Sequence, residues 1–400
     1  MKETRLTRRH LIGAAAAMGT MLTGGRVLAQ SKGEIRIGQT APYSGPASAY
    51  STSAKTQAAY FQMINDQGGV NGRMIKIISL DDSLSPPKTV EQVRKLIEQE
   101  QVLALFGQTG TASIAATSKY ITSKQVPNLF IGSGAARWSD AKESPWSTAF
   151  NLSYSAEAAI YGRYVLKTKP GAKIAVFYQN DDFGKDYLIG LKRALGADAA
   201  KMIVAEASYE ITDPTVDSQI LTLKASGADT FMNFATAKFA AQAIRKIYDL
   251  GWTPLHMLSN VSASVGATLA PAGLDKSVGI LTVQYYKDVS DPQWKDDPMA
   301  LKYRAFMARY YREASMDDSF NVYGYIVAQT MVQVFKQCGN DLSRQNLMKQ
   351  ALSIKNFKPD LLVPGVSINT SDTNHGCINQ AQLARFGGKQ WALFGDVLSV

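Results

Sequence analysis

Short apolar runs alternate with longer amphipathic stretches along this chain, and the alternation restarts near residue 150. A short apolar run is typical of a buried strand, and apolar residues spaced three and four apart are typical of a helix. Helical crossovers of this length join parallel strands. The elements expected in the first block are strand 35–38, helix 52–67, strand 74–80, a helix opened by Pro86-Pro87, strand 102–106, helix 111–124 and strand 128–131.

The second block repeats the pattern, so two separate sheets are expected rather than one. This arrangement predicts the α/β class, with two doubly wound parallel-sheet lobes. The elements expected there are strand 173–178, helix 183–195, strand 202–207, a helix capped by Asp213-Pro214 that ends near Ser226, strand 230–234, helix 238–250 and strand 256–258.

The stretch from Gly279 onward has too few strands for a sheet of its own. It offers one strand at 280–284, helices at 299–312 and 322–338, and a β-rich tail after Leu361. We therefore expect it to return to the first two lobes and complete them rather than to form a third domain.

The first residues have the layout of an export signal. Thr7-Arg8-Arg9-His10-Leu11-Ile12 resembles a twin-arginine signal, and an apolar, Ala/Gly-rich stretch at 11–23 leads to Val27-Leu28-Ala29. A charged start, an apolar middle and small residues before a cleavage point are typical of secretory signals. We expect residues 1–29 to be removed and the mature protein to reach a bacterial periplasm by the twin-arginine route.

Charge and cysteine content exclude some classes of protein. The net charge is +10, but much of the basic excess lies in the segment 1–29, and the rest forms no basic stretch. Nucleic acid is therefore not an expected partner. Only Cys338 and Cys377 are present, which excludes a disulfide scaffold. Pairing between them is possible, but we expect two unpaired thiols.

The sequence contains few residue patterns that are typical of catalysis. His10 is lost with the signal, and His256 and His375 stand far apart without a cluster of cysteines or carboxylates, so no metal and no cofactor is expected. Gly132-Ser133-Gly134 imitates the start of a dinucleotide fingerprint, but Arg137 stands where the third glycine belongs, which favours an ordinary tight turn.

Three loops beyond strand ends are rich in glycine and small hydroxylated residues. In open α/β sheets a ligand binds at that edge, and the exposed N–H groups of helix N-termini favour an anion such as a carboxylate. Ordinary turn chemistry explains each loop alone, but three on one edge favour a binding cleft. The loops are 41–50, 107–111 and 132–138.

From Glu34 to about Ser399 the chain resembles the periplasmic solute-binding proteins of the leucine/isoleucine/valine type, which serve ABC importers. The segments that carry the resemblance are Ala41-Pro42-Tyr43-Ser44-Gly45-Pro46, Gly68-Gly69-Val70-Asn71-Gly72-Arg73, Tyr178-Gln179-Asn180-Asp181-Asp182-Phe183-Gly184 and 221–229.

The resemblance implies a type I periplasmic binding protein fold, with two lobes joined by a three-strand hinge and a ligand enclosed between them. Residues 30–152 and 282–364 would form the N-terminal lobe, and residues 153–281 and 365–400 the C-terminal lobe. It also implies a monomer without enzymatic activity whose partners are a small carboxylate and a membrane permease.

The resemblance also assigns ligand contacts. It places Thr111 on the hydroxyl that holds the ligand carboxylate, Tyr50 and Phe183 on aromatic positions, and Gly134 and Ala136 on a loop that brackets the ligand. The full set of expected ligand-binding residues is Tyr43, Ser44, Tyr50, Thr109, Thr111, Gly134, Ala135, Ala136, Arg137, Trp138, Phe183, Thr236, Asn260 and Tyr285.

The chain departs from this family where the ligand's amino group would bind. Ala136 lacks a hydroxyl, and Asn260 replaces an acidic residue, so an ammonium would lack its charged partner. This predicts an aromatic acid in preference to leucine or valine, with Arg137 as an additional carboxylate partner. The alternative is that Asp181 or Asp182 binds the ammonium of a branched-chain amino acid. Two other functions stay open: a ligand sensor for a membrane receptor, and an enzyme built on the same fold.

Overall fold

A computed structural model describes residues 33–399 of the chain. The expected export signal, residues 1–29, lies outside the described residues. Within the described part no helix is both long enough and apolar enough to span a membrane. Cys338 and Cys377 are both buried and unpaired, which confirms the expectation of free thiols.

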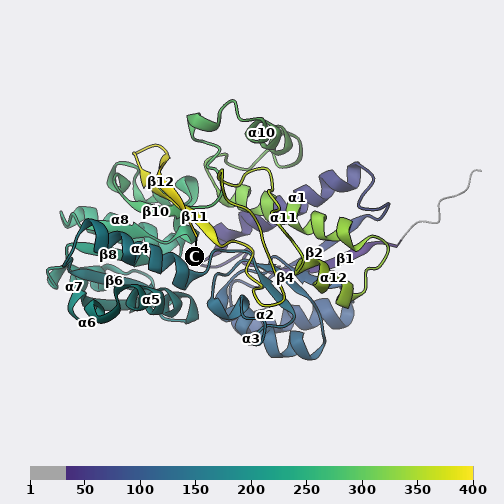
Figure 1. The fold of residues 1–400 in the computed structure, drawn as a ribbon, viewed down its shortest axis with the longest axis horizontal. Helices are drawn as coiled ribbons and strands as arrows, with labels where there is room; N and C mark the ends of the chain where they lie inside the picture. Colours follow the sequence, from purple (N-terminus) through teal and green to yellow (C-terminus); the bar gives the residue numbers. More distant parts are fainter. Residues whose placement is uncertain (1–32, 400) are drawn as a thin grey trace, which may run out of the picture. The chain divides into compact units, whose positions relative to one another are not determined.

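The first sheet has five parallel strands in the order β2-β1-β3-β4-β5. Helix α11 packs against α1 beside this sheet (Figure 1). The strands are β1 (Ile35–Ala41), β2 (Ile75–Asp81), β3 (Ala104–Phe106), β4 (Asn128–Ile131) and β5 (Ser147–Ala149). The helices that accompany them are α1 (Ser51–Asp66), α2 (Pro86–Arg94), α3 (Thr111–Ser123), α10 (Pro298–Tyr310), α11 (Phe320–Cys338) and α12 (Arg344–Ala351).

The second sheet repeats the strand order of the first before adding two more strands. Its order is β7-β6-β8-β9-β10, followed by β11 and β12. The strands are β6 (Ile174–Gln179), β7 (Ile203–Tyr209), β8 (Thr230–Phe234), β9 (Leu255–Leu258), β10 (Leu281–Gln284), β11 (Gln380–Phe386) and β12 (Trp391–Ser399). Its helices are α4 (Tyr154–Thr168), α5 (Asp182–Leu195), α6 (Ala199–Met202), α7 (Asp217–Ala225), α8 (Ala237–Asp249) and α9 (Ala270–Ala272).

The two doubly wound lobes are therefore confirmed, with one correction to their strands. β11 runs antiparallel to β10, and β12 antiparallel to β11, so the second sheet is mixed rather than wholly parallel. β11 and β12 are joined by a short turn and pair as a hairpin, whereas β11 reaches β10 only after a long connection through helices α10, α11 and α12. The β-rich tail expected after Leu361 supplies this antiparallel edge.

The chain passes between the two sheets three times: after β5, after β10 and before β11. The expected boundary between the lobes at 281/282 falls inside β10. The whole of this strand belongs to the second sheet, where it hydrogen-bonds to β11. The connections touch one another through single bridges, such as Tyr286 to Leu362, and not as regular strands. How the remaining residues divide between lobes stays a prediction.

Local sequence explains most element boundaries. In α8, Phe239, Ala243 and Ile247 recur on one face and are buried in the core of the second sheet. The expected cap of α7 is wrong, because this helix begins at Asp217. The Asp213 carboxylate instead accepts the backbone N–H of Glu210 at 2.9 Å.

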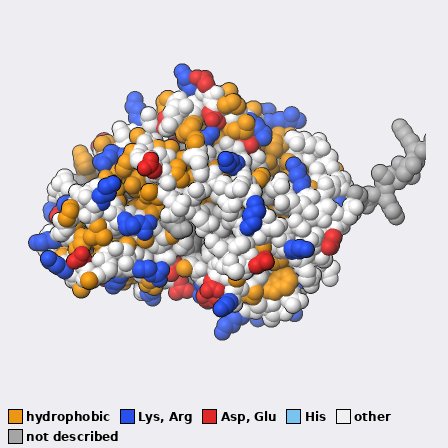
Figure 2. Space-filling model, in the orientation of Figure 1, with side chains coloured by type: hydrophobic (Ala, Val, Ile, Leu, Met, Phe, Trp, Pro, Cys, Tyr) orange, Lys and Arg blue, Asp and Glu red, His pale blue; other side chains and the backbone are white. Residues whose placement is uncertain are grey.

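Surface charge is mixed on the face drawn in Figure 2. Blue Lys and Arg side chains alternate there with red Asp and Glu, and the described residues on that face form no extended basic patch. The basic excess of the described chain is thus dispersed on this face, as its sequence indicated.

Candidate ligand-binding site

A cavity of about 230 Å³ lies where the carboxyl ends of strands from both sheets meet. Lining residues follow closely after β2, β3, β4, β6, β7, β8, β9 and β10, as the rule for open α/β sheets requires. Leu84, Pro86 and the segment 109–113 come from the loops and helix N-termini that follow β2 and β3, and the segment 179–181 and Thr236 come from the ends of β6 and β8.

Seven aromatic side chains among the described residues contribute to the walls. Tyr154 and Phe183 meet edge to face with ring centroids 5.0 Å apart, and Tyr50 lies 4.9 Å from Phe320. Burial raises the pKa of the Tyr50 hydroxyl to about 12, so it is neutral at pH 7. Such walls suit a flat apolar group. The lining aromatics are Tyr50, Tyr154, Phe183, Tyr285, Tyr286, Phe320 and Tyr323.

Hydroxyl groups meet at the end of the cavity nearest α3. Ser133 Oγ accepts N–H bonds from Ala135 at 3.3 Å and from the Trp138 indole at 3.2 Å, and lies 2.8 Å from Thr111 Oγ1. Since both acceptor positions of Ser133 are filled, its proton is directed to Thr111. The Tyr154 hydroxyl adjoins the same pair. At least one of the Thr111 and Tyr154 protons therefore remains for an acceptor in the cavity.

The N-terminus of α3 adds further donors. Gly110 precedes the helix with φ of 99° and provides no side-chain cap. The N–H groups of the first turn have no acceptor inside the helix. Ser113 Oγ, which is buried and lines the cavity, has no hydrogen-bond partner within the described chain. We call the Thr111, Ser113 and Tyr154 hydroxyls, with the first-turn N–H groups, the donor end.

Among the described residues that line the cavity, none is Lys, Arg or His. The donor end must therefore attract an anion through neutral hydroxyl and N–H groups together with the helix dipole. Two carboxylates lie on the side of the second sheet. Asp181 accepts the N–H groups of Phe183 and Gly184 at 3.0 and 3.3 Å as the cap of α5, and Glu210 accepts the Asn180 amide at 2.7 Å.

The structure brings half of the expected binding residues to the cavity. Those that line it are Tyr50, Thr109, Thr111, Phe183, Thr236, Asn260 and Tyr285. Those that do not line it are Tyr43, Ser44, Gly134, Ala135, Ala136, Arg137 and Trp138.

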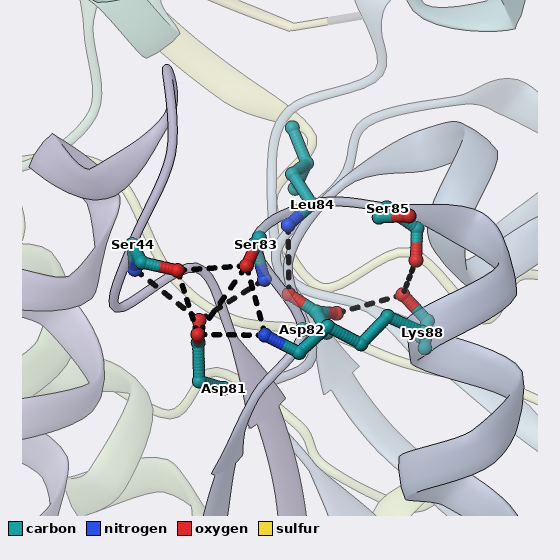
Figure 3. A network of polar contacts seen from close by, with 8 residues as sticks. Ser44, Asp81, Asp82, Ser83, Leu84, Ser85 and Lys88 are labelled. Atoms are coloured by element: carbon teal, nitrogen blue, oxygen red, sulfur yellow. Dashed lines mark hydrogen bonds and ion pairs between the residues drawn. The ribbon is translucent and has the colours of Figure 1, made fainter.

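The misplaced residues of the first loop have partners of their own. Tyr43 Oη lies 2.7 Å from Ser79 Oγ, and Ser44 Oγ donates to Asp81 at 2.6 Å (Figure 3). The turn that follows β1 therefore ties its polar groups to the end of β2, and only Tyr50, further along, reaches the cavity.

The loop after β4 is corrected in the same way. The Ala136 N–H donates to Asp186 at 2.6 Å, and Trp138 is fully buried. Arg137 pairs with Glu143 at 2.7 Å and with Asp182 at 3.4 Å, so its guanidinium is occupied outside the cavity. Apart from Gly132, which lines the cavity, this loop supports the donor end from behind through Ser133.

Asn260 lines the cavity but its amide is anchored elsewhere. Its Nδ2 donates to the Val283 carbonyl at 2.7 Å, and its backbone N–H donates to Glu157 at 2.7 Å. Glu157 is buried and also accepts the hydroxyls of Tyr161 and Tyr187 at 2.8 and 2.9 Å. Burial raises the pKa of Glu157 to about 7, against the hydrogen bonds that favour its charged form.

Sequence reasoning missed several residues of the site. Tyr154, Phe320 and Tyr323 come from the first turns of α4 and α11, where they read as ordinary core aromatics. Leu84 stands in the loop after β2, which carried none of the expected contacts. Only Ser113, two residues beyond Thr111 in the same helix, had a usable signal. Among the described residues, no cluster of His, Cys, Asp or Glu is arranged to hold a metal ion.

Comparison with known proteins assigns the family. The family model described as periplasmic binding protein matches residues 34–390. The chain belongs to this family, and the two-lobed fold is that of its type I members of the leucine/isoleucine/valine-binding kind.

Individual relatives are distant but cover nearly the whole chain. A protein of Brucella suis named Leu/Ile/Val-binding protein homolog 7 is 22% identical over 395 residues, covering 96% of this chain and 94% of that protein. A branched-chain amino acid ABC transporter structure from Thermus thermophilus with bound valine has a TM-score of 0.81 at 16% identity, covering 92% of this chain and 97% of that one. An R. palustris solute-binding protein in complex with benzoate has a TM-score of 0.76 at 20% identity, covering 92% and 98%.

Proposed function

We propose that this protein captures a small carboxylate in the periplasm and delivers it to a membrane ABC importer, with an aromatic acid preferred over leucine or valine. Binding occurs without turnover. The protein reaches the periplasm by the twin-arginine signal around Arg8-Arg9, and it acts as a monomer.

One observation carries the choice of ligand: a donor end faces a cavity with aromatic walls. A carboxylate accepts hydrogen bonds from Thr111, Ser113 and the first-turn N–H groups of α3, while a flat ring lies between Tyr50, Tyr154 and Phe183. The benzoate bound by the R. palustris protein is a ligand of this kind.

A branched-chain amino acid is the second candidate, and Asp181 is what favours it. Its carboxylate lines the cavity, and valine is bound in the Thermus thermophilus structure. Asp181 is already engaged by Gln179 at 2.7 Å and by two backbone N–H groups, which leaves little capacity for an ammonium. Asp182 does not line the cavity.

Titration calorimetry with benzoate and leucine side by side tests the proposal. We expect benzoate to bind more tightly. Thr111→Val, which removes one donor hydroxyl and keeps the shape, should weaken benzoate by about 1–3 kcal/mol. The control is Thr117→Val on the same helix, whose hydroxyl donates to the Ile114 carbonyl and does not line the cavity. Tight leucine binding without any response to benzoate would contradict the aromatic preference, and no response to either would contradict carboxylate capture.

A further inference from the structure

The loop after β2 holds two consecutive residues in the left-handed region. Ser83 and Leu84 have φ of 52° and 56°. For a leucine this backbone conformation is strained, so the surrounding contacts must maintain it. Figure 3 shows how they do: Asp81 accepts the Ser83 N–H at 3.0 Å, and Asp82 accepts the Leu84 N–H at 3.0 Å.

Asp82 is the better buried of the two aspartates, with 0% of its surface exposed. Its second oxygen accepts the Thr89 hydroxyl at 2.8 Å, which fixes the turn to α2. Asp81 is held from outside by Lys88 at 2.8 Å and by Ser44 Oγ at 2.6 Å. The conformation of Leu84 is therefore set by side chains that do not themselves line the cavity.

The Leu84 side chain lies against Gly110, the residue that precedes α3. A Cβ placed on Gly110 would overlap Leu84 Cδ1, and both residues line the cavity. Leu84 thus covers one side of the donor end with an apolar group. A ligand whose carboxylate binds at α3 must place the atom next to its carboxyl group close to this leucine.

We propose that Leu84 is a specificity-determining residue, which narrows the cavity beside the donor end and excludes ligands substituted next to the carboxylate. Asp82 is its positioning residue. This inference rests on the proposed function, because it takes the donor end as the carboxylate subsite. It adds which carboxylates are rejected: aliphatic acids branched at the carbon that bears the carboxyl group, and aromatic acids substituted ortho to it.

Calorimetry with benzoate, 2-methylbenzoate and 4-methylbenzoate tests the inference. Leu84→Ala should improve the affinity for 2-methylbenzoate relative to benzoate by about tenfold, the usual effect of one methylene-sized space. The affinity of 4-methylbenzoate relative to benzoate should stay unchanged. Leu221→Ala, which truncates an exposed leucine on α7, is the control and should change neither ratio. If the affinity of 2-methylbenzoate relative to benzoate is unchanged in Leu84→Ala, the inference is overturned. The proposed function still stands in that case, provided that the parent protein binds benzoate.

If the parent binds leucine instead of benzoate, the inference is overturned, because leucine is itself branched at the carbon that bears the carboxyl group. If the parent binds neither acid, the proposed function fails and this inference with it. The role of Asp82 has its own readout. Asp82→Ala should raise the affinity of 2-methylbenzoate relative to benzoate, as Leu84→Ala does. Asp82→Asn, whose amide oxygen can still accept the Leu84 N–H, should keep this relative affinity at the parent value. A ratio that stays at the parent value in a folded Asp82→Ala variant contradicts the positioning role.

Discussion

The two sheets contribute unlike halves to the cavity. On the side of the first sheet, two turns are fixed by neighbours a few residues away: Ser133 with Ala135 and Trp138, and Asp82 with Leu84. On the side of the second sheet, Asn260 is fixed through Glu157, which lies 103 residues earlier in the chain. These two turns depend on local hydrogen bonds, whereas Asn260 depends on a buried long-range network.

This difference determines how each half responds to substitution. A local turn loses a hydrogen bond or two when one side chain is changed, and the neighbouring elements keep their places. Glu157 instead joins α4 to Tyr187 of α5 and to the backbone of Asn260 beyond β9, so its protonation affects several elements at once.

The largest change in the free energy of unfolding is expected at Glu157, on the side of the second sheet. Burial raises its pKa from 4.5 to about 7, so the folded protein holds the proton more tightly than the unfolded chain. Its contribution to the free energy of unfolding is complete below about pH 4.5 and is lost as the pH rises to about 7. Glu157→Gln is neutral throughout, so its stability relative to the parent should rise by about 3 kcal/mol across that window.

Urea denaturation of both proteins between pH 4 and pH 8 measures this difference. Other groups that titrate in the same range cancel in the comparison, because the two proteins differ at one position. Parallel stability curves for the parent and Glu157→Gln would show that folding does not raise the pKa of Glu157, and would contradict a role for its protonation in the second half.

An intermediate effect is expected at the aspartate pair after β6, where the second half also contains a local turn. Asp181→Ala removes the cap that accepts the N–H groups of Phe183 and Gly184, which should cost about 1 kcal/mol of stability. Asp182→Ala, the adjacent control, loses only an exposed pair with Arg137 at 3.4 Å and should cost less than about 0.5 kcal/mol. Thermal denaturation of the two variants compares them, and equal losses would contradict the capping role.

The fold was largely predictable because its signals are local. Apolar strands and amphipathic helices follow each other at crossover spacing in both blocks, and the observed strand orders repeat. Strand β5 and the antiparallel pairing of β11 with β10 were missed. β5 has three residues, and pairing between distant segments leaves no periodic trace in the sequence.

The cavity lining was most predictable where a residue follows closely after a strand end. Thr109, Thr111 and Thr236 fall on the cavity because the carboxyl ends of parallel strands meet there. The contacts at 134–138 were misplaced because Ser133 bends that loop toward Trp138 and Asp186 holds its backbone. The sequence did not identify Tyr154 and Tyr323, because an aromatic residue in a helix gives the same sequence pattern whether its side chain faces a core or a cavity.

The smallest effect is expected at Arg137, where the two halves touch outside the cavity. Its guanidinium lies 2.7 Å from Glu143 in the first half and 3.4 Å from Asp182 in the second. Exposed pairs of this kind contribute about 0.2–1 kcal/mol. Arg137→Gln should therefore change the unfolding equilibrium constant and the dissociation constant of benzoate by less than about fivefold each. If the guanidinium instead bound the ligand carboxylate, its loss would remove a charged hydrogen bond of about 1.5–3 kcal/mol and weaken benzoate by more than about tenfold. Calorimetry on this one variant separates the two geometries, because a large loss of affinity without loss of stability requires Arg137 to turn into the cavity when ligand is present.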